Sequence, residues 1–196
     1  MLQAVQLKLW EAAELGDAAE VQRCLEAGAK TAVRNRLGWN ALHRACMSGS
    51  VQTVVHMLPA GSEEAAKTRS LLLSTPDGAG YYPLHIAAGC GHTTTVQLLL
   101  KAGAEVDKKT AEPKEGNGGS SDADTPVHTA CKALADPDRE PQTEELLDVV
   151  VALLSAGGLL EALNAKGRMA VQYLPQAMQG KLLRRVKPPT DSVSVE

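Results

Sequence analysis

Several features that would point to a particular class of protein are missing from this chain of 196 residues. Phenylalanine is absent and only two tryptophans and three tyrosines occur, so leucine, valine and alanine must build the core. No run of eighteen apolar residues exists, and we expect no membrane-spanning helix. The net charge of −3 is too small to predict nucleic acid or an anionic membrane as the partner.

The sequence also lacks the usual signs of catalysis, phosphate binding and metal binding. No serine or cysteine lies in a nucleophile motif with a histidine base. Neither glycine pair is a phosphate loop: Gly78-x-Gly80 has no G-x-x-G continuation, and Gly89-x-Gly91 separates two expected helices with no strand before it. We therefore expect a chain that is not an enzyme, with no catalytic residue, no cofactor and no bound metal.

The four cysteines are widely separated and form no C-x-x-C pair: Cys24, Cys46, Cys90 and Cys131. This spacing argues against a disulfide framework and against a redox pair. The N-terminus lacks the basic and apolar regions of a secretory leader. We expect an intracellular protein, cytoplasmic or nuclear.

What the chain does contain is a repeated two-helix pattern, seen best in residues 80–107. Pro83 is suited to open a short helix that Gly91 ends. The apolar stripe Val96–Leu100 predicts a second helix, which Gly103 stops. Helices this short are marginal in isolation, so the unit needs neighbours of its own kind.

Neighbouring units of the same kind are marked by histidines: His43 lies 42 residues before His85, and His128 lies 43 residues after it. Alanine, valine, leucine and glycine follow each marker at offsets of 2, 11, 15 and 18 residues. The matching sets are Trp10, Ala12, Val21, Leu25 and Gly28; His43, Ala45, Val54, Leu58 and Gly61; and His85, Ala87, Val96, Leu100 and Gly103. After His128, eleven inserted residues precede Val150, Leu154 and Gly157. Such periodicity is typical of a repeat protein.

These segments resemble ankyrin repeats. The resemblance is carried by Pro83-Leu84-His85-Ile86-Ala87-Ala88 with Gly91-His92, and less completely by Thr125-Pro126-Val127-His128-Thr129-Ala130 and Ala41-Leu42-His43-Arg44-Ala45. It covers nearly all of residues 5–175. The resemblance implies an all-α solenoid of stacked helix-turn-helix units with short projecting turns or hairpins. It also implies histidines that bridge the backbone of the turns.

We predict one ankyrin-repeat domain over residues 1–187 and a flexible tail over 188–196. Its repeats are expected at approximately 1–34, 35–72, 78–107, 122–158 and 165–187, with insertions near 62–77, 108–123 and 134–145. Ser62 should start an extra helical turn or two in the first insertion. The polar, glycine-rich 108–123 segment is expected to be a mobile loop.

The candidate binding residues are those that vary between repeats while the frame stays constant. They follow the turn glycine or the marker histidine, or lie close by: Arg34, Arg36, Trp39, Arg44, Met47, Tyr81, Ile86, Asp124, Thr129 and Arg168. We expect Trp39 and Tyr81 to be adjacent and substantially exposed, which is the composition of an interface centre. The alternative is that the two rings pack on each other and stiffen the turns.

The function that follows is non-catalytic protein binding, as an adapter or scaffold, with another protein as the partner. The alternative is a regulatory subunit, either an inhibitor or an assembly chaperone of an enzyme. We expect a monomer. The pattern does not identify the partner, because a fold does not fix a function.

Overall fold

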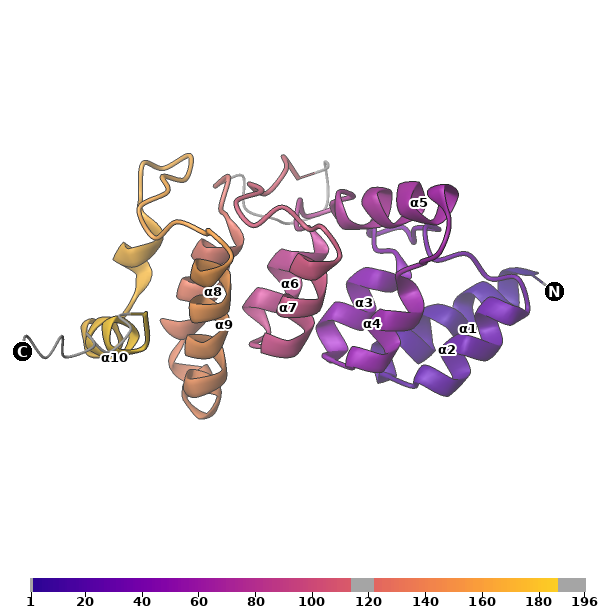
Figure 1. The fold of residues 1–196 in the computed structure, drawn as a ribbon, viewed down its shortest axis with the longest axis horizontal. Helices are drawn as coiled ribbons and strands as arrows, with labels where there is room; N and C mark the ends of the chain where they lie inside the picture. The colour runs from indigo at the N-terminus through magenta and orange to yellow at the C-terminus, as the bar shows by residue number, and fades with distance from the viewer. Residues whose placement is uncertain (1, 114–121, 187–196) are drawn as a thin grey trace, which may run out of the picture.

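The computed structural model describes residues 2–113 and 122–186, and this part of the chain is all-helical (Figure 1). Its elements are α1 (Leu2–Leu15), α2 (Ala18–Glu26), α3 (Ala41–Ser48), α4 (Val51–Met57), α5 (Glu63–Leu73), α6 (Pro83–Gly89), α7 (Thr93–Lys101), α8 (Pro126–Leu134), the 3-10 helix η1 (Pro137–Gln142), α9 (Thr143–Ser155), the 3-10 helix η2 (Ala170–Tyr173) and α10 (Gln176–Val186). Within the described ranges, no helix is long and apolar enough to cross a membrane.

The helices form two rows that run along the long axis of the molecule (Figure 1). The inner row is α1, α3, α6, α8 and η2, each in contact with the next. The outer row is α2, α4, α7, α9 and α10, also in sequence. Each of the first four inner helices packs on its own outer helix, which confirms the predicted solenoid.

The local sequence explains where these helices begin. Five N-cap side chains accept a hydrogen bond from a backbone N–H three residues later: Asp17, Asn40, Ser50, Ser62 and Thr125. Such caps satisfy amides that have no partner inside the helix. The repeated alanine and valine positions then fill the core, since Ala45, Val54, Ala87 and Val96 are all fully buried.

The marker histidines connect neighbouring repeats. The Nε2 atom of His85 lies 2.9 Å from the Asp124 carbonyl oxygen, and that of His128 lies 3.1 Å from the Arg168 carbonyl oxygen. This confirms the predicted bridging role for these two residues. His43 also faces the next turn, since the backbone of Thr75 and Tyr81 acts to raise its pKa, but its Nε2 atom makes no hydrogen bond of normal geometry among the described residues.

Tyr82 changes the N-terminus of α6. In α3 and α8 the cap side chain lies within hydrogen-bond distance of the histidine Nδ1 atom, at 2.7 Å in α3 and 2.8 Å in α8. Tyr82 makes no side-chain cap hydrogen bond, and the Nδ1 atom of His85 has no partner in the described part of the chain. The tyrosine ring instead lies over the histidine, with the ring centroids 5.7 Å apart.

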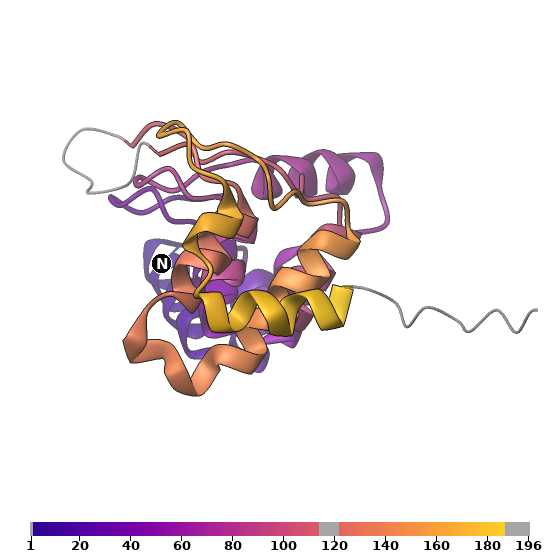
Figure 2. The ribbon, with the colours of Figure 1, turned by 90° about the vertical axis from the view of Figure 1, so that its left-hand side faces the viewer.

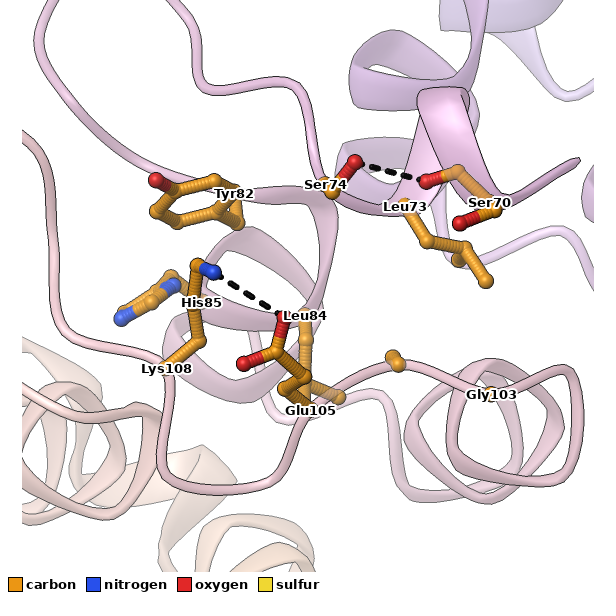
Figure 3. A pocket seen from close by; sticks show the side chains of 10 residues that line it. Ser70, Leu73, Ser74, Tyr82, Leu84, His85, Gly103, Glu105 and Lys108 are labelled. Atoms are coloured by element: carbon orange, nitrogen blue, oxygen red, sulfur yellow. Dashed lines mark hydrogen bonds and ion pairs between the residues drawn. The ribbon is translucent and has the colours of Figure 1, made fainter. Parts of the chain in front are cut away.

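The first insertion forms a longer helix than the sequence predicts. Ser62 caps α5 as expected, but the helix continues for 11 residues because Leu72 and Leu73 find buried positions. Leu73 and Ser74 at its C-terminal end lie beside Tyr82 (Figure 3). The third insertion forms η1 and leads into α9, whose 13 residues make it the longest outer helix.

Part of the expected mobile loop forms backbone hydrogen bonds. Residues 114–121 lie outside the described residues, as does the predicted tail over 188–196. The backbone N–H of Thr110 donates to the Asp124 carbonyl at 2.8 Å, and that of Ala111 donates to the Gly80 carbonyl at 2.9 Å. These two bonds connect Thr110 and Ala111 to neighbouring turns, and the mobility of the segment stays a prediction.

The projecting turns, which join each outer helix to the next inner helix, all leave on one side (Figure 2). Single backbone hydrogen bonds connect neighbouring turns. Besides the bond from Ala111 to Gly80, Gly78 N–H donates to the Leu37 carbonyl at 2.8 Å. Ala165 N–H donates to the Asp122 carbonyl at 2.6 Å.

Candidate protein interface

A shallow, open groove of about 270 Å³ lies between α6 and α8. Three predicted binding residues meet there, namely Tyr81, Ile86 and Thr129. The remaining lining residues are His85, Gly89, Cys90, Ala133, Asp136 and Arg139. The apolar core beneath these residues is fully packed, so the groove lies on the outside of the solenoid.

Trp39 and Tyr81, the two aromatic residues predicted for the binding surface, are placed differently from the prediction. Trp39 is half-buried against His43, and Tyr81 is half-buried against His85, with 6.2 Å between ring centroids in both pairs. Burial raises the pKa of the Tyr81 phenol, and the Asp124 carboxylate adds to this shift. No ring contact joins Trp39 to Tyr81 among the described residues. The expectation of two adjacent, substantially exposed rings is wrong, because each ring packs on the histidine of its own repeat.

Arg44 and Met47 lie on the inner helix of the second repeat. The Arg44 guanidinium forms an ion pair with Glu14 of α1, so it bridges the first two inner helices. Met47 is 38% exposed, and its backbone carbonyl oxygen lies 3.0 Å from the Nε2 atom of His92. Met47 thus adds an exposed apolar side chain to the inner face.

Two predicted binding residues have structural roles in the turns. Arg34 donates hydrogen bonds to the carbonyls of Gly38, at 2.8 Å, and Pro76, at 2.6 Å, and so braces two projecting turns. The Asp124 side chain is only 3% exposed, so its expected place on an open face is wrong. Arg36 and Arg168 are exposed, and Arg168 lies 6.0 Å from the Tyr173 ring centroid.

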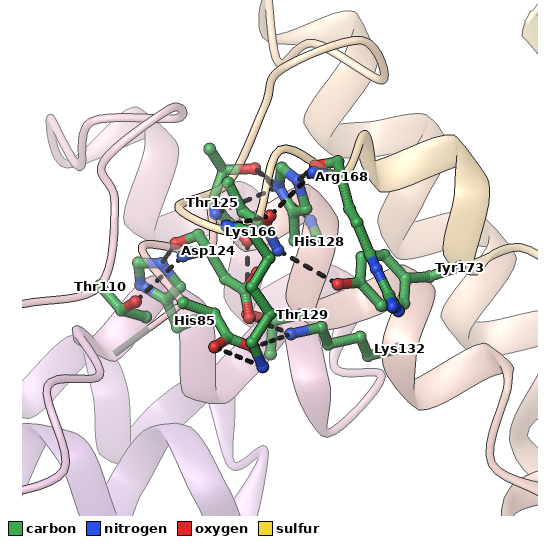
Figure 4. Close-up of polar contacts among 12 residues, drawn as sticks. His85, Thr110, Asp124, Thr125, His128, Thr129, Lys132, Lys166, Arg168 and Tyr173 are labelled. Carbon is green, nitrogen blue, oxygen red and sulfur yellow. Dashed lines mark hydrogen bonds and ion pairs between the residues drawn. The ribbon is translucent and has the colours of Figure 1, made fainter. Parts of the chain in front are cut away.

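Asp124 belongs to a polar network between the last two repeats (Figure 4). Lys132 forms ion pairs with both Asp124 and Asp122. The Asn164 amide donates to the Asp124 carboxylate at 2.9 Å and to the Tyr173 hydroxyl at 3.1 Å. This network joins α8 to the last projecting turn by polar contacts.

Replacing Lys132 with methionine should lower the free energy of unfolding by about 1–2 kcal/mol, because Asp124 would lose the cation that balances its buried charge. We place the expected loss below that of a fully buried pair, since Lys132 is 30% exposed. Urea unfolding of the full chain measures the change. Lys67→Met is the control, because the Lys67–Glu63 pair on α5 is highly exposed. An equal effect of both substitutions would contradict this account of the network.

Arg139 is a residue of the groove that sequence reasoning missed. It lies in the third insertion, outside the repeat pattern, and its guanidinium donates to the Gly89 carbonyl at one end of the groove. The sequence carries no signal that places Cys90 in this groove. It is half-buried in the groove, and burial raises the pKa of its thiol.

All four cysteines are free. Cys46 and Cys131 are fully buried, and burial raises the pKa of the Cys131 thiol to about 12. Among the described residues, no group of three or more histidine, cysteine, aspartate or glutamate side chains could hold a metal ion.

Stacked two-helix units with turns projecting on one side together define a helical-repeat protein. The family described as ankyrin repeats (3 copies) matches residues 9–110, which is more than half of the chain. The chain belongs to the ankyrin-repeat family, whose repeats generally serve as modules for binding other proteins.

The similar proteins are much longer than the aligned segments. The human SMC5-SMC6 complex localization factor protein 1 is 30% identical over 142 residues, which are 71% of this chain and 11% of that protein. The bovine ankyrin repeat and SOCS box protein 3 is 31% identical over 101 residues, 52% of this chain and 18% of that protein. The human tRNA endonuclease ANKZF1 is 40% identical over 67 residues, 34% of this chain and 9% of that protein.

Proposed function

We propose that this chain is a non-catalytic adapter or scaffold that binds a partner protein through the groove between α6 and α8. The observation that carries the proposal is the convergence of Tyr81, Ile86 and Thr129 in one groove. These positions vary between repeats, whereas the buried positions around them repeat. Variable residues on a constant frame are what a binding surface requires.

The lining of the groove indicates the kind of contact that the partner makes. Ile86, Gly89 and Ala133 offer an apolar floor, whereas Thr129, Asp136 and Arg139 supply polar groups at its sides. An apolar side chain of the partner fits this floor, and polar groups around it fix the orientation. Arg36 and Arg168 are exposed on the projecting turns, where they can pair with carboxylates of the partner.

The names of two relatives support an adapter role, since one is a localization factor of a complex and another is a SOCS box protein. By this proposal the chain acts as a monomer inside the cell, in the cytoplasm or the nucleus. The four free cysteines suit a reducing compartment.

The test is to identify a partner by crosslinking to the full chain, purify it, and measure its affinity for substituted chains. Ile86→Ala and Thr129→Arg should each weaken binding about tenfold, because both alter the floor or the side of the groove. Val55→Ala is the control, since Val55 is exposed on the outer helix α4. Circular dichroism checks that all three chains fold. Unchanged affinity in the first two chains, or equal loss in the control, would overturn this assignment of the surface.

A further inference from the structure

A second groove lies at the N-terminal end of the solenoid, between α1 and the segment 28–33. It has a volume of about 420 Å³. Its lining residues are Gln3, Gln6, Leu7, Trp10, Gly28, Lys30 and Val33. Leu7 is 57% exposed and Val33 is 39% exposed, so the groove presents apolar side chains to solvent. The indole N–H of Trp10 has no hydrogen-bond acceptor among the described residues.

The same position exists in the third repeat. An offset of 75 residues relates Trp10 to His85, the marker positions of the two repeats. Five lining residues of the N-terminal groove have counterparts that line the small cavity of Figure 3: Leu7 with Tyr82, Trp10 with His85, Gly28 with Gly103, Lys30 with Glu105, and Val33 with Lys108. The two sites are therefore equivalent by the register of the repeats.

In the third repeat this site is already filled. The C-terminal end of α5 supplies Ser70, Leu73 and Ser74 to its lining (Figure 3). Leu73 is only 8% exposed, and a volume of about 50 Å³ remains, against 420 Å³ at the N-terminal groove. The molecule itself thus shows an occupant that fits this position, namely the last turn of a helix that carries a leucine.

The N-terminal groove is held open by the chain. The Gln6 amide donates to the Lys30 carbonyl at 3.0 Å, and its oxygen accepts from the Lys30 backbone N–H at 3.0 Å. These two bonds fix the segment 28–33 to α1. An occupant therefore enters a preformed site, which lowers the entropic cost of binding.

We propose that the N-terminal groove binds the C-terminal turn of a leucine-bearing helix of a partner protein, as α5 fills the equivalent site in cis. The leucine packs on Leu7, Trp10 and Val33. The negative end of the helix dipole suits the positive charge of Lys30, whose counterpart in the third repeat is Glu105 paired with Lys108. This surface is separate from the groove between α6 and α8.

The probe for this site is a synthetic peptide of residues 62–75, which contains the whole of α5. It is titrated into the full chain labelled with ¹⁵N, and NMR follows the two indole N–H signals of Trp10 and Trp39. The Trp10 signal should shift saturably and the Trp39 signal should not. A peptide with Leu72→Ser and Leu73→Ser should leave both signals in place. A chain with Leu7→Ser and Val33→Ser should bind the native peptide about tenfold more weakly, since exposed apolar contacts are lost without disturbing the core.

Three results would overturn the proposal. The Trp10 signal could stay unchanged at millimolar peptide, or the leucine-free peptide could shift it equally. Light scattering could also show that the chain alone doubles its mass with concentration, and that Leu7→Ser abolishes the doubling. That result would make a second copy the occupant. None of these outcomes affects the Ile86→Ala test, so the two surfaces can fail separately.

Discussion

The free energy of unfolding should fall by about 2 kcal/mol for each of His43 and His85 when the pH is lowered from 7 to 5. Both side chains are fully buried, and burial lowers the pKa of each from 6.5 to about 4. The positive charge of Arg34 acts in the same direction on His43. At His85, the carbonyl and the charge of Asp124 partly oppose the effect of burial.

The sign of this pH dependence follows from the number of protons that the folded and unfolded states bind. An unfolded chain protonates these histidines near pH 6.5, whereas the folded chain does so only near pH 4. Between these values the unfolded state binds more protons, so acid favours it. The stabilisation is complete above pH 6.5, falls as the pH falls, and is fully lost below about pH 4. Burial raises the pKa of Asp77, which contributes with the opposite sign.

Urea unfolding at pH 7, 6 and 5 measures this dependence, and His85→Gln is its matched control. Glutamine is tolerated at the marker position, because Gln172 holds it in the last repeat and accepts from Met169 N–H at 2.9 Å. The His85→Gln chain should lose about 2 kcal/mol less than the native chain between pH 7 and 5. Asp77 is present in both chains, so its effect cancels. The same pH dependence in both chains would show that His85 is not the source.

Gly80→Ala should destabilise the protein by about 3 kcal/mol. Gly80 has a φ of +92°, which side chains other than glycine rarely adopt. A Cβ atom there would also lie 2.0 Å from the Ala111 carbonyl oxygen. The Ala111 backbone has little room to move, because its N–H donates to the Gly80 carbonyl. The substitution must therefore break the bond between two projecting turns or distort both.

Gly61→Ala separates the effect of the backbone conformation from the effect of the steric contact. Gly61 has a similar φ of +97°, but a Cβ atom there would meet nothing within 4 Å. Only the backbone conformation is then unfavourable, and the expected loss is about 1 kcal/mol. Thermal and urea unfolding of both chains give the comparison. Equal losses would mean that contact with the neighbouring turn adds nothing.

The sequence predicted the frame because the frame depends on local and periodic features. Val54 and Val96 are fully buried where the repeat places them, and Ser62 caps its helix as expected. Burial at the repeated positions depends only on the spacing of apolar residues. Capping depends only on a side chain that accepts a hydrogen bond from the backbone N–H three residues later. Neither requires knowledge of the rest of the chain.

The candidate surface was harder to predict, because it depends on contacts between repeats. The exposure of Trp39 depends on the orientation of His43, and Asp124 is buried by Lys132 and by Asn164, which lies 40 residues away in sequence. Arg139 lies in an insertion that has no counterpart in the other repeats. Repeat spacing predicts which residues lie outside the core, but it does not predict which side chains from other repeats pack on them.

The attachment of α10 gives the C-terminal end a sensitivity to ionic strength that the middle of the solenoid lacks. Leu182 is its only buried residue, and Lys181 and Arg185 hold it to Glu144 and Asp148 of α9. These ion pairs are exposed, and raising the salt from 0.1 to 1 M shortens the Debye length from about 10 Å to about 3 Å. We therefore expect concentrated salt to loosen α10 first, while the apolar packing between α6 and α8 stays intact. Fraying of the last helix would then expose the flank of α9 on which it lies.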